Sequence, residues 1–157
     1  MKKITPAAIS ALAAKAQQSP RLRANLNLHE QLPDPIQRLA IAMEPGTYVR
    51  MHRHPHTWEL LHSLAGRFVV LNFDEAGVVT ERVVLGEECA MVEIPAGVWH
   101  AVLSLDAGGV IFEVKHGPYT PIAEQDYFPG SPAEGDQGVG GMLDWYGTVR
   151  LGENVPA

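Results

Sequence analysis

The segment that decides the fold runs from Gly46 to Gly66 and reads GTYVRMHRHPHTWELLHSLAG. It holds four of the chain's seven histidines together with one glutamate, Glu59. Side chains two residues apart in a β-strand point to the same face, so His52 and His54 should project together toward one point. Glu59 can return to that point from the next strand. The segment therefore predicts two imidazoles and a carboxylate gathered on strands.

A fourth donor is expected from a distant strand. The stretch PAGVWH, residues 95–100, places His100 directly behind a Pro-Gly turn. Three neutral imidazoles and one carboxylate suit a divalent first-row transition metal, which leaves Fe, Zn, Mn and Ni as candidates. Octahedral coordination would keep two positions for water or substrate. We therefore predict one metal ion held by His52, His54, Glu59 and His100.

Short runs typical of β-strands fill the chain between residues 37 and 117. Residues 67–73 lead through a turn at 74–77 into residues 78–85, which predicts a hairpin. Pro, Gly and Asp separate these runs, and no helical period lies between them. This pattern is typical of an all-β sandwich or barrel. The other predicted strands are 38–44, 47–54, 90–94, 98–105 and 110–116.

The two ends of the chain differ from this strand-rich part. Thr5 and Pro6 have the pattern of a helix N-cap and first helical residue, and Ile9, Leu12 and Ala16 form one apolar stripe. They predict a short N-terminal helix. The C-terminal forty residues are rich in Gly and Pro, with room for one short element at MLDWYG. We divide the chain into a helix and lead-in segment (1–36), a β-barrel (37–117) and an irregular tail (118–157).

Composition excludes several classes of protein. The chain has 157 residues, the size of one domain, with 12 Lys and Arg against 18 Asp and Glu. No basic run interrupts this acidic balance, so no nucleic-acid partner is expected. The one cysteine, Cys89, excludes an internal disulfide and fits a reducing compartment. Without a secretory signal or a run of about 20 apolar residues, we expect a cytoplasmic protein that does not cross a membrane.

The spacing of the predicted ligands resembles the first sequence motif of the cupin superfamily. That motif, G-x5-H-x-H-x3,4-E-x6-G, is matched at every fixed position between Gly46 and Gly66. The resemblance implies a double-stranded β-helix, the cupin jelly-roll barrel. It implies the same four metal ligands as the strand argument.

The second cupin motif, G-x5-P-x-G-x2-H-x3-N, is matched in part. Pro95, Gly97 and His100 occupy its fixed positions. Eight residues instead of five separate Gly86 from Pro95, and Ser104 stands in place of the asparagine. Neither departure touches a predicted ligand, so the departures concern loop detail.

A narrower resemblance extends over residues 19–119. The stretches SPRLRANLNLH, PGTYVRMHRH, IPAGVWH and VIFEVKHGPY are similar to those of the WbuC-type cupin fold metalloproteins. These small bacterial proteins are often associated with gene clusters for O-antigen and other cell-surface polysaccharides. The resemblance implies a small carbohydrate-derived metabolite as the substrate. It also implies a homodimer, because small cupins have open sheet edges that are normally covered, and the lead-in segment would pack across the partner.

The remaining histidines are expected outside the metal site. His56 shares the parity of His54, but Pro55 breaks the strand between them. We place His56 at the mouth of the site and keep it as an alternative ligand. His62 should face the opposite side of its strand from Glu59 and is predicted not to bind metal. His29 and His116 lie outside both motifs and are read as structural.

Candidates for catalysis come from parity with the ligands. Tyr48 and Arg50 share the parity of His52. We predict that Arg50 grips an anionic substrate group, and we keep a salt bridge to a core carboxylate such as Glu113 as the alternative. Glu113 and Lys115 share one strand face, either as a buried ion pair or as acid–base groups.

Three functions are compatible with these residues. The first is a metal-dependent isomerase or epimerase-like enzyme, in which the metal polarises a substrate oxygen and Glu113 or Tyr48 moves a proton. The second is an Fe(II)-dependent dioxygenase, with substrate and O2 side by side at the two open positions. The third is a non-catalytic, metal-dependent binder of a small molecule.

Overall fold

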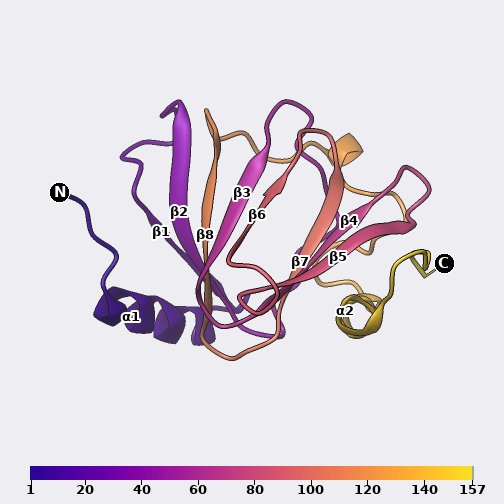
Figure 1. Ribbon diagram of the computed structural model, residues 1–157, viewed down its shortest axis with the longest axis horizontal. Helices are drawn as coiled ribbons and strands as arrows, with labels where there is room; N and C mark the ends of the chain where they lie inside the picture. The colour runs from indigo at the N-terminus through magenta and orange to yellow at the C-terminus, as the bar shows by residue number, and fades with distance from the viewer. Residues whose placement is uncertain (157) are drawn as a thin grey trace.

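The computed structural model describes residues 1–156 and consists mainly of antiparallel strands (Figure 1). Within these residues, one sheet has the strand order β1-β2-β8-β3-β6 and the other has the order β5-β4-β7. The sheets are not closed into a continuous barrel by strand pairing in the described part of the chain. The strands are β1 (Arg23–Asn27), β2 (Ile36–Met43), β3 (Glu59–Ala65), β4 (Phe68–Phe73), β5 (Val79–Leu85), β6 (Met91–Ile94), β7 (Trp99–Ser104) and β8 (Gly109–His116).

The main core lies between the inner faces of the two sheets. Phe68 and Val70 of β4 meet Leu61 and Ile111 of the larger sheet there. The alternate residues of β4 pack on the other side of the smaller sheet, among them Leu71. Because β4 is covered on both faces, its sequence FVVLNF is almost continuously apolar. The predicted all-β class and the predicted hairpin β4–β5 are confirmed.

Two helices cover the outer faces of the sheets (Figure 1). Helix α1 (Pro6–Gln17) begins at the N-cap Thr5, whose hydroxyl accepts a hydrogen bond from Ala8 N–H at 3.2 Å. Its buried residues Leu12 and Ala16 pack on alanines of the larger sheet, which confirms the predicted N-terminal helix. Helix α2 (Val139–Thr148) covers the smaller sheet and is longer than the short element expected there. Among residues 1–156, neither helix is long and apolar enough to span a membrane.

Two segments differ from the sequence-based expectation. The lead-in segment contributes β1, which pairs with β2 at the edge of the larger sheet. Residues 47–54, predicted as a strand, are extended and pair with β7 through a bridge between His52 and His100. Next to His52, the Met51 carbonyl accepts from Phe128 N–H at 3.0 Å. The backbone of this segment is thus shared between β7 and the C-terminal part of the chain, which includes the short 3₁₀ helix η1 (Glu124–Asp126).

Candidate metal centre

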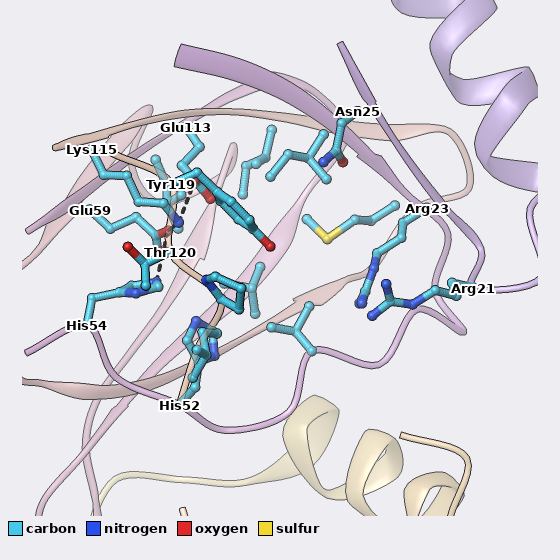
Figure 2. Close-up of a pocket in the computed structure, with 18 of the residues that line it drawn as sticks. Arg21, Arg23, Asn25, His52, His54, Glu59, Glu113, Lys115, Tyr119 and Thr120 are labelled. Atoms are coloured by element: carbon cyan, nitrogen blue, oxygen red, sulfur yellow. Dashed lines mark hydrogen bonds and ion pairs between the residues drawn. The ribbon is translucent and has the colours of Figure 1, made fainter. Parts of the chain in front are cut away.

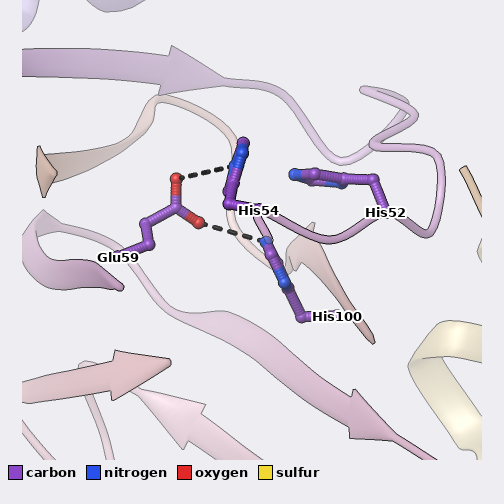
Figure 3. A group of neighbouring side chains, drawn as sticks. All are labelled: His52, His54, Glu59 and His100. Atoms are coloured by element: carbon purple, nitrogen blue, oxygen red, sulfur yellow. Dashed lines mark ion pairs between the residues drawn. The ribbon is translucent and has the colours of Figure 1, made fainter. Parts of the chain in front are cut away.

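The four predicted ligands meet at one point between the sheets. Figure 3 shows the carboxylate of Glu59 facing the imidazoles of His54 and His100, with the imidazole of His52 on the far side of these two rings. One ligand atom from each of the four lies within 4.8 Å of the others. His52 and His54 come from the extended segment before β3, Glu59 begins β3, and His100 lies on β7. Residues from both sheets therefore build the cluster.

Backbone hydrogen bonds hold the two ligand segments together. His52 N–H donates to the His100 carbonyl at 3.0 Å, and His100 N–H donates to the His52 carbonyl at 2.8 Å. This reciprocal pair brings the two ring centroids to 4.3 Å. The His54 carbonyl accepts from Gly97 N–H at 2.9 Å. Gly97 has φ of +80°, a left-handed conformation that favours glycine, which explains its place in the PAG turn.

Carbonyl oxygens orient two of the rings. His52 Nδ1 lies 2.8 Å from the Arg50 carbonyl, and His100 Nδ1 lies 2.9 Å from the Val98 carbonyl. A carbonyl oxygen only accepts hydrogen bonds, so Nδ1 carries the proton in each ring. Nε2 then keeps its lone pair. A second hydrogen bond of this kind is the usual support of a metal-binding histidine.

The environment of the Nε2 atoms of His54 and His100 indicates whether these residues could bind a metal. Both atoms are buried and lack a hydrogen-bond partner among residues 1–156. His100 Nε2 lies 3.2 Å from Glu59 Oε2, and His54 Nε2 lies 3.6 Å from Glu59 Oε1, without hydrogen-bond geometry. Leaving a buried polar atom unpaired costs about 1–3 kcal/mol. Two such atoms facing one carboxylate form a donor set that suits a divalent transition metal, and the cluster indicates metal binding.

The protonation states agree with this donor set. Burial lowers the pKa of the His52 imidazole well below its usual range and that of His54 to about 4, so both rings are neutral at neutral pH. Burial alone would raise the pKa of the Glu59 carboxyl. The charge of Lys115 and the contact with His100 outweigh this effect, and the pKa lies well below its ordinary value. The site therefore offers a carboxylate and neutral imidazoles.

A cavity of about 380 Å³ opens from the cluster into the space between the sheets (Figure 2). Lys115 and Glu113 of β8 line it beside Glu59, which settles that this face of β8 points inward. Lys115 Nζ lies 3.1 Å from Glu59 Oε1 and 2.9 Å from Glu113 Oε1. Burial, and then the charge of Glu59, raises the pKa of Glu113 to about 8 despite Lys115. The cavity thus places a carboxyl group and an ammonium group next to the metal ligands.

The structure does not bring Tyr48 or Arg50 to the cluster. Tyr48 O–H donates to the Pro132 carbonyl at 3.0 Å, and its ring packs in the core under α2. Arg50 donates from Nε to Ser131 Oγ at 3.1 Å, and its Nη1 lies 3.3 Å from Glu124 Oε1. Its carboxylate partner is therefore Glu124 and not the Glu113 considered from the sequence.

The cause is a break in the expected alternation of side chains. Tyr48 and Met51, three residues apart, both enter the core beneath α2, whereas the regular strand expected here would keep a period of two. Of the residues described, the cavity lining includes neither Tyr48 nor Arg50. Both residues instead line a smaller neighbouring hollow that also includes His52, Arg21, Arg23 and Glu134. The substrate role of Arg50 and the proton-transfer role of Tyr48 stay predictions.

The other histidines lie outside the cluster. His56 is exposed in the loop that follows His54, and it lines a neighbouring hollow. His62 Nδ1 lies 2.8 Å from the Ala90 carbonyl, on the opposite face of β3 from Glu59. His116 packs against Trp58 and His29 contacts the backbone of Arg38.

Sequence reasoning missed the residues that β1 and the turn before it contribute to the cavity. Arg21, Arg23 and Asn25 line it on the side away from Lys115 (Figure 2). A signal was present, because polar residues alternate with Leu22, Ala24 and Leu26 through this stretch. Such alternation is typical of a strand with one polar face. The neighbouring turn formers favoured a lead-in loop instead.

Several solved structures have a similar cupin fold. KdgF from Halomonas sp. gives a TM-score of 0.51 at 14% identity, over 66% of this chain and 85% of that protein. BH2720 from Bacillus halodurans gives 0.53 at 17% identity, over 78% and 86%. Oxalate decarboxylase of Bacillus subtilis, a protein with Mn(II) centres, gives 0.50 at 20% identity, over 68% and 27%. At these identities the likeness shows the fold alone, and it confirms the predicted cupin jelly roll.

Sequence comparisons are less informative about activity. Among curated proteins, none matches the chain. The narrower WbuC-type resemblance is not confirmed by these comparisons. A family model does match residues 4–85, which is more than half of the chain and includes three of the four predicted ligands. The chain therefore belongs to the family described as Domain of unknown function (DUF6016).

Proposed function

We propose that this chain is a metal-dependent enzyme that acts on a small, carbohydrate-derived metabolite. One divalent ion would be bound by His52, His54, Glu59 and His100. The observation that carries the proposal is the opening of this buried donor cluster into a cavity of about 380 Å³. Sites for small molecules usually occupy concave spaces of this size, with a few polar groups that converge on one region.

The residues of β8 supply the remaining chemistry. When bound, a divalent metal polarises a substrate oxygen as a Lewis acid. Glu113 faces the same cavity, and its contact with Lys115 fixes the position of its carboxyl group. It is the best-placed group to take a proton from a substrate carbon or to return one. Lys115 also contacts Glu59, so it orients both carboxyl groups at once.

Two further features of the proposal come from resemblance. Similarity to the WbuC-type proteins supports a role in cell-surface polysaccharide metabolism. The Mn(II) centres of Bacillus subtilis oxalate decarboxylase, which has a similar fold, support manganese as one candidate beside Fe, Zn and Ni.

We also propose a homodimer, because β1 and β6 form the edges of the larger sheet and sheet edges are normally covered. Light scattering at micromolar protein tests the dimer.

The test of the enzyme begins with the metal. Protein purified without added metal should contain close to one transition-metal ion per chain, measured by mass spectrometry. Incubation with sugar nucleotides in D2O should then exchange a carbon-bound proton. Glu113→Gln should abolish the exchange and keep the metal, whereas Glu93→Gln, on the exposed side of β6, should change neither.

The alternatives give different results in the same experiment. Oxygen uptake by the Fe(II)-loaded protein, without proton exchange, would replace the proposal by a dioxygenase. Tight binding of a sugar nucleotide with no turnover would replace it by a non-catalytic binder. Protein that binds no metal at all would reject the proposal outright.

A further inference from the structure

The inner face of β1 is polar, although it lines the space between the sheets. Arg23 and Asn25 point into the cavity, and so does Arg21, just before the strand. Ala24 and Leu26 face the other way and pack in the cluster beneath α1. This face of β1 stays open to solvent, because Arg21 and Asn25 are exposed and Arg23 is partly buried. Its polar side chains are therefore accessible to a ligand that enters the cavity.

These residues and the histidine cluster lie on opposite sides of one cavity. Figure 2 shows Arg21, Arg23 and Asn25 on one side and His54 with Lys115 on the other. The wall between them is apolar and includes Ile41, Met43, Leu61 and Ile111. A ligand that fills the cavity would therefore meet positive charge at the end away from His54 and Lys115, while His52 lines a smaller hollow together with Arg21 and Arg23. Lys115, at the other end, already contacts the carboxyl groups of Glu59 and Glu113.

The two arginines converge on a single carboxylate, that of Glu134. Arg21 Nε donates to Glu134 Oε1 at 2.7 Å, and Arg21 Nη2 donates to Oε2 at 2.5 Å. Arg23 Nη2 lies 3.3 Å from the same Oε2, while its Nη1 donates to the Tyr48 carbonyl at 2.9 Å. Two-pronged contact of this kind is how arginine recognises carboxylate and phosphate groups. The arginines are therefore already positioned for an anion.

Glu134 is suited to give way to another anion. It lies in the segment between η1 and α2, next to Gly135, and its side chain is 42% exposed. Ion pairs at exposed positions contribute little to folding stability. Arg23 is more enclosed, with a side chain 22% exposed, and the Tyr48 carbonyl keeps it in place when Glu134 leaves.

We propose that Arg21 and Arg23 form an anion subsite, in which the Glu134 carboxylate stands in for a carboxylate or phosphate group of the ligand. Asn25 lies next along the strand and offers an amide to a ligand hydroxyl. The ligand is then an anionic sugar derivative whose other end reaches the histidine cluster. Only this last point rests on the proposed function; the subsite itself does not. Arg21 and Arg23 thereby take the role predicted from the sequence for Arg50.

The test measures binding of three probes by calorimetry with the full chain: glucuronate, glucose 6-phosphate and glucose. The two anions should bind more tightly than glucose, and their relative affinity identifies carboxylate or phosphate as the preferred group. Arg23→Gln and Arg21→Gln should weaken anion binding by about tenfold or more, the usual effect of losing charged hydrogen bonds. Glu134→Ala should strengthen it by about two- to fivefold, because an internal competitor is removed.

A matched ion pair outside the cavity provides the control. Arg67 and Glu87 are 2.8 Å apart and are absent from the cavity lining described here. Arg67→Gln and Glu87→Ala should leave the affinity for both anions unchanged. Melting temperatures of all variants show whether any loss of binding reflects unfolding.

The opposite signs expected at Arg23 and Glu134 make the outcome decisive. Weaker anion binding by Glu134→Ala would overturn the subsite, since Glu134 would then act only as a structural clamp. Equal affinity for glucose and both anions, or no anion binding by Glu134→Ala at millimolar probe, would overturn it as well. Repeating the titrations after chelation separates the two proposals: anion preference kept without metal supports the subsite even if the metal-dependent reaction fails.

Discussion

The two ends of the cavity are built in different ways. At the histidine end His52, Glu59 and His100 are buried and His54 is partly buried, and backbone carbonyls orient the rings of His52 and His100. At the arginine end, Arg21 is exposed and shares an exposed glutamate with Arg23. Side chains in a buried, hydrogen-bonded cluster are held in one arrangement, whereas exposed ion pairs can rearrange at little cost in stability. The comparison suggests that the first end sets the chemistry and the second sets the choice of ligand.

The largest effect is expected from removing a ligand at the histidine end. His100→Ala should reduce the metal content from about one ion per chain to well below one, because one of four donors is lost. His52→Ala and His54→Ala should do the same, and Glu59→Gln should weaken binding less completely. Elemental analysis after gel filtration measures this, with His62→Ala as the matched histidine control. Full occupancy in His100→Ala would remove the basis for the comparison.

The next effect concerns Lys115, which lies between two buried carboxyl groups. Lys115→Met should lower the free energy of unfolding of the metal-free protein by about 3–5 kcal/mol, because the ionised Glu59 then lacks its counter-charge and Glu113 loses its ammonium partner. Chemical denaturation measures it, with the exposed Lys15→Met as the control. The double variant Lys115→Met with Glu113→Gln should recover part of the loss. A change below 1 kcal/mol in the single variant would show that the histidine end is looser than the structure indicates.

Acid should also weaken the histidine end. The pKa of His54 is lowered to about 4 in the folded protein, so the unfolded chain binds this proton first as the pH falls. Above about pH 6.5, the ordinary pKa of histidine in the unfolded chain, the ring is neutral in both states and the unfolding free energy is unaffected. As the pH falls from there toward 4, protonation of the unfolded chain lowers the unfolding free energy. The metal-free protein should lose about 3 kcal/mol of unfolding free energy over this range. His54→Gln should reduce the slope of the curve between pH 6.5 and 5, where few carboxylates titrate, and leave the contribution of His52, whose pKa is also lowered; an unchanged slope would contradict the assignment.

The smallest effect is expected from Arg50. Its contacts are Ser131, the exposed Glu124 and the ring of Tyr127, with the guanidinium carbon 4.6 Å from the ring centroid. Arg50→Ala should lower the unfolding free energy by about 1 kcal/mol and leave the metal in place. Its affinity for glucuronate should stay near that of the wild type, in contrast to Arg23→Gln. Loss of anion binding in Arg50→Ala would move the anion subsite away from β1.

The difference between the two ends also explains what the sequence could predict. His52, His54 and Glu59 lie within eight residues, so their spacing carries the information about the site. His100 was found through its Pro-Gly turn, whose glycine has the left-handed conformation that such a turn needs. The strands from β4 to β8 were predictable because each is a short run rich in apolar residues and followed by turn formers.

No local sequence pattern predicts the arginine end of the cavity. Arg21 and Glu134 are 113 residues apart, and no spacing rule links them. The prediction that Tyr48 points to the same side as His52 was wrong, because this extended segment pairs through a bridge at His52 and not along its whole length. Side-chain direction in such a segment depends on which distant backbone it contacts. That information lies in the tertiary structure.

The bridge between His52 and His100 bears on the order in which the protein acquires its metal. It joins two positions 48 residues apart through backbone groups, without using the imidazole nitrogens that face the cluster. The entropy of closing that long loop is therefore lost during folding and not when the ion binds. Small zinc domains behave differently, because they stay unfolded until the metal arrives. Here the chain can fold before it binds a metal, so the ion that it binds will depend on which metals are available to the folded protein.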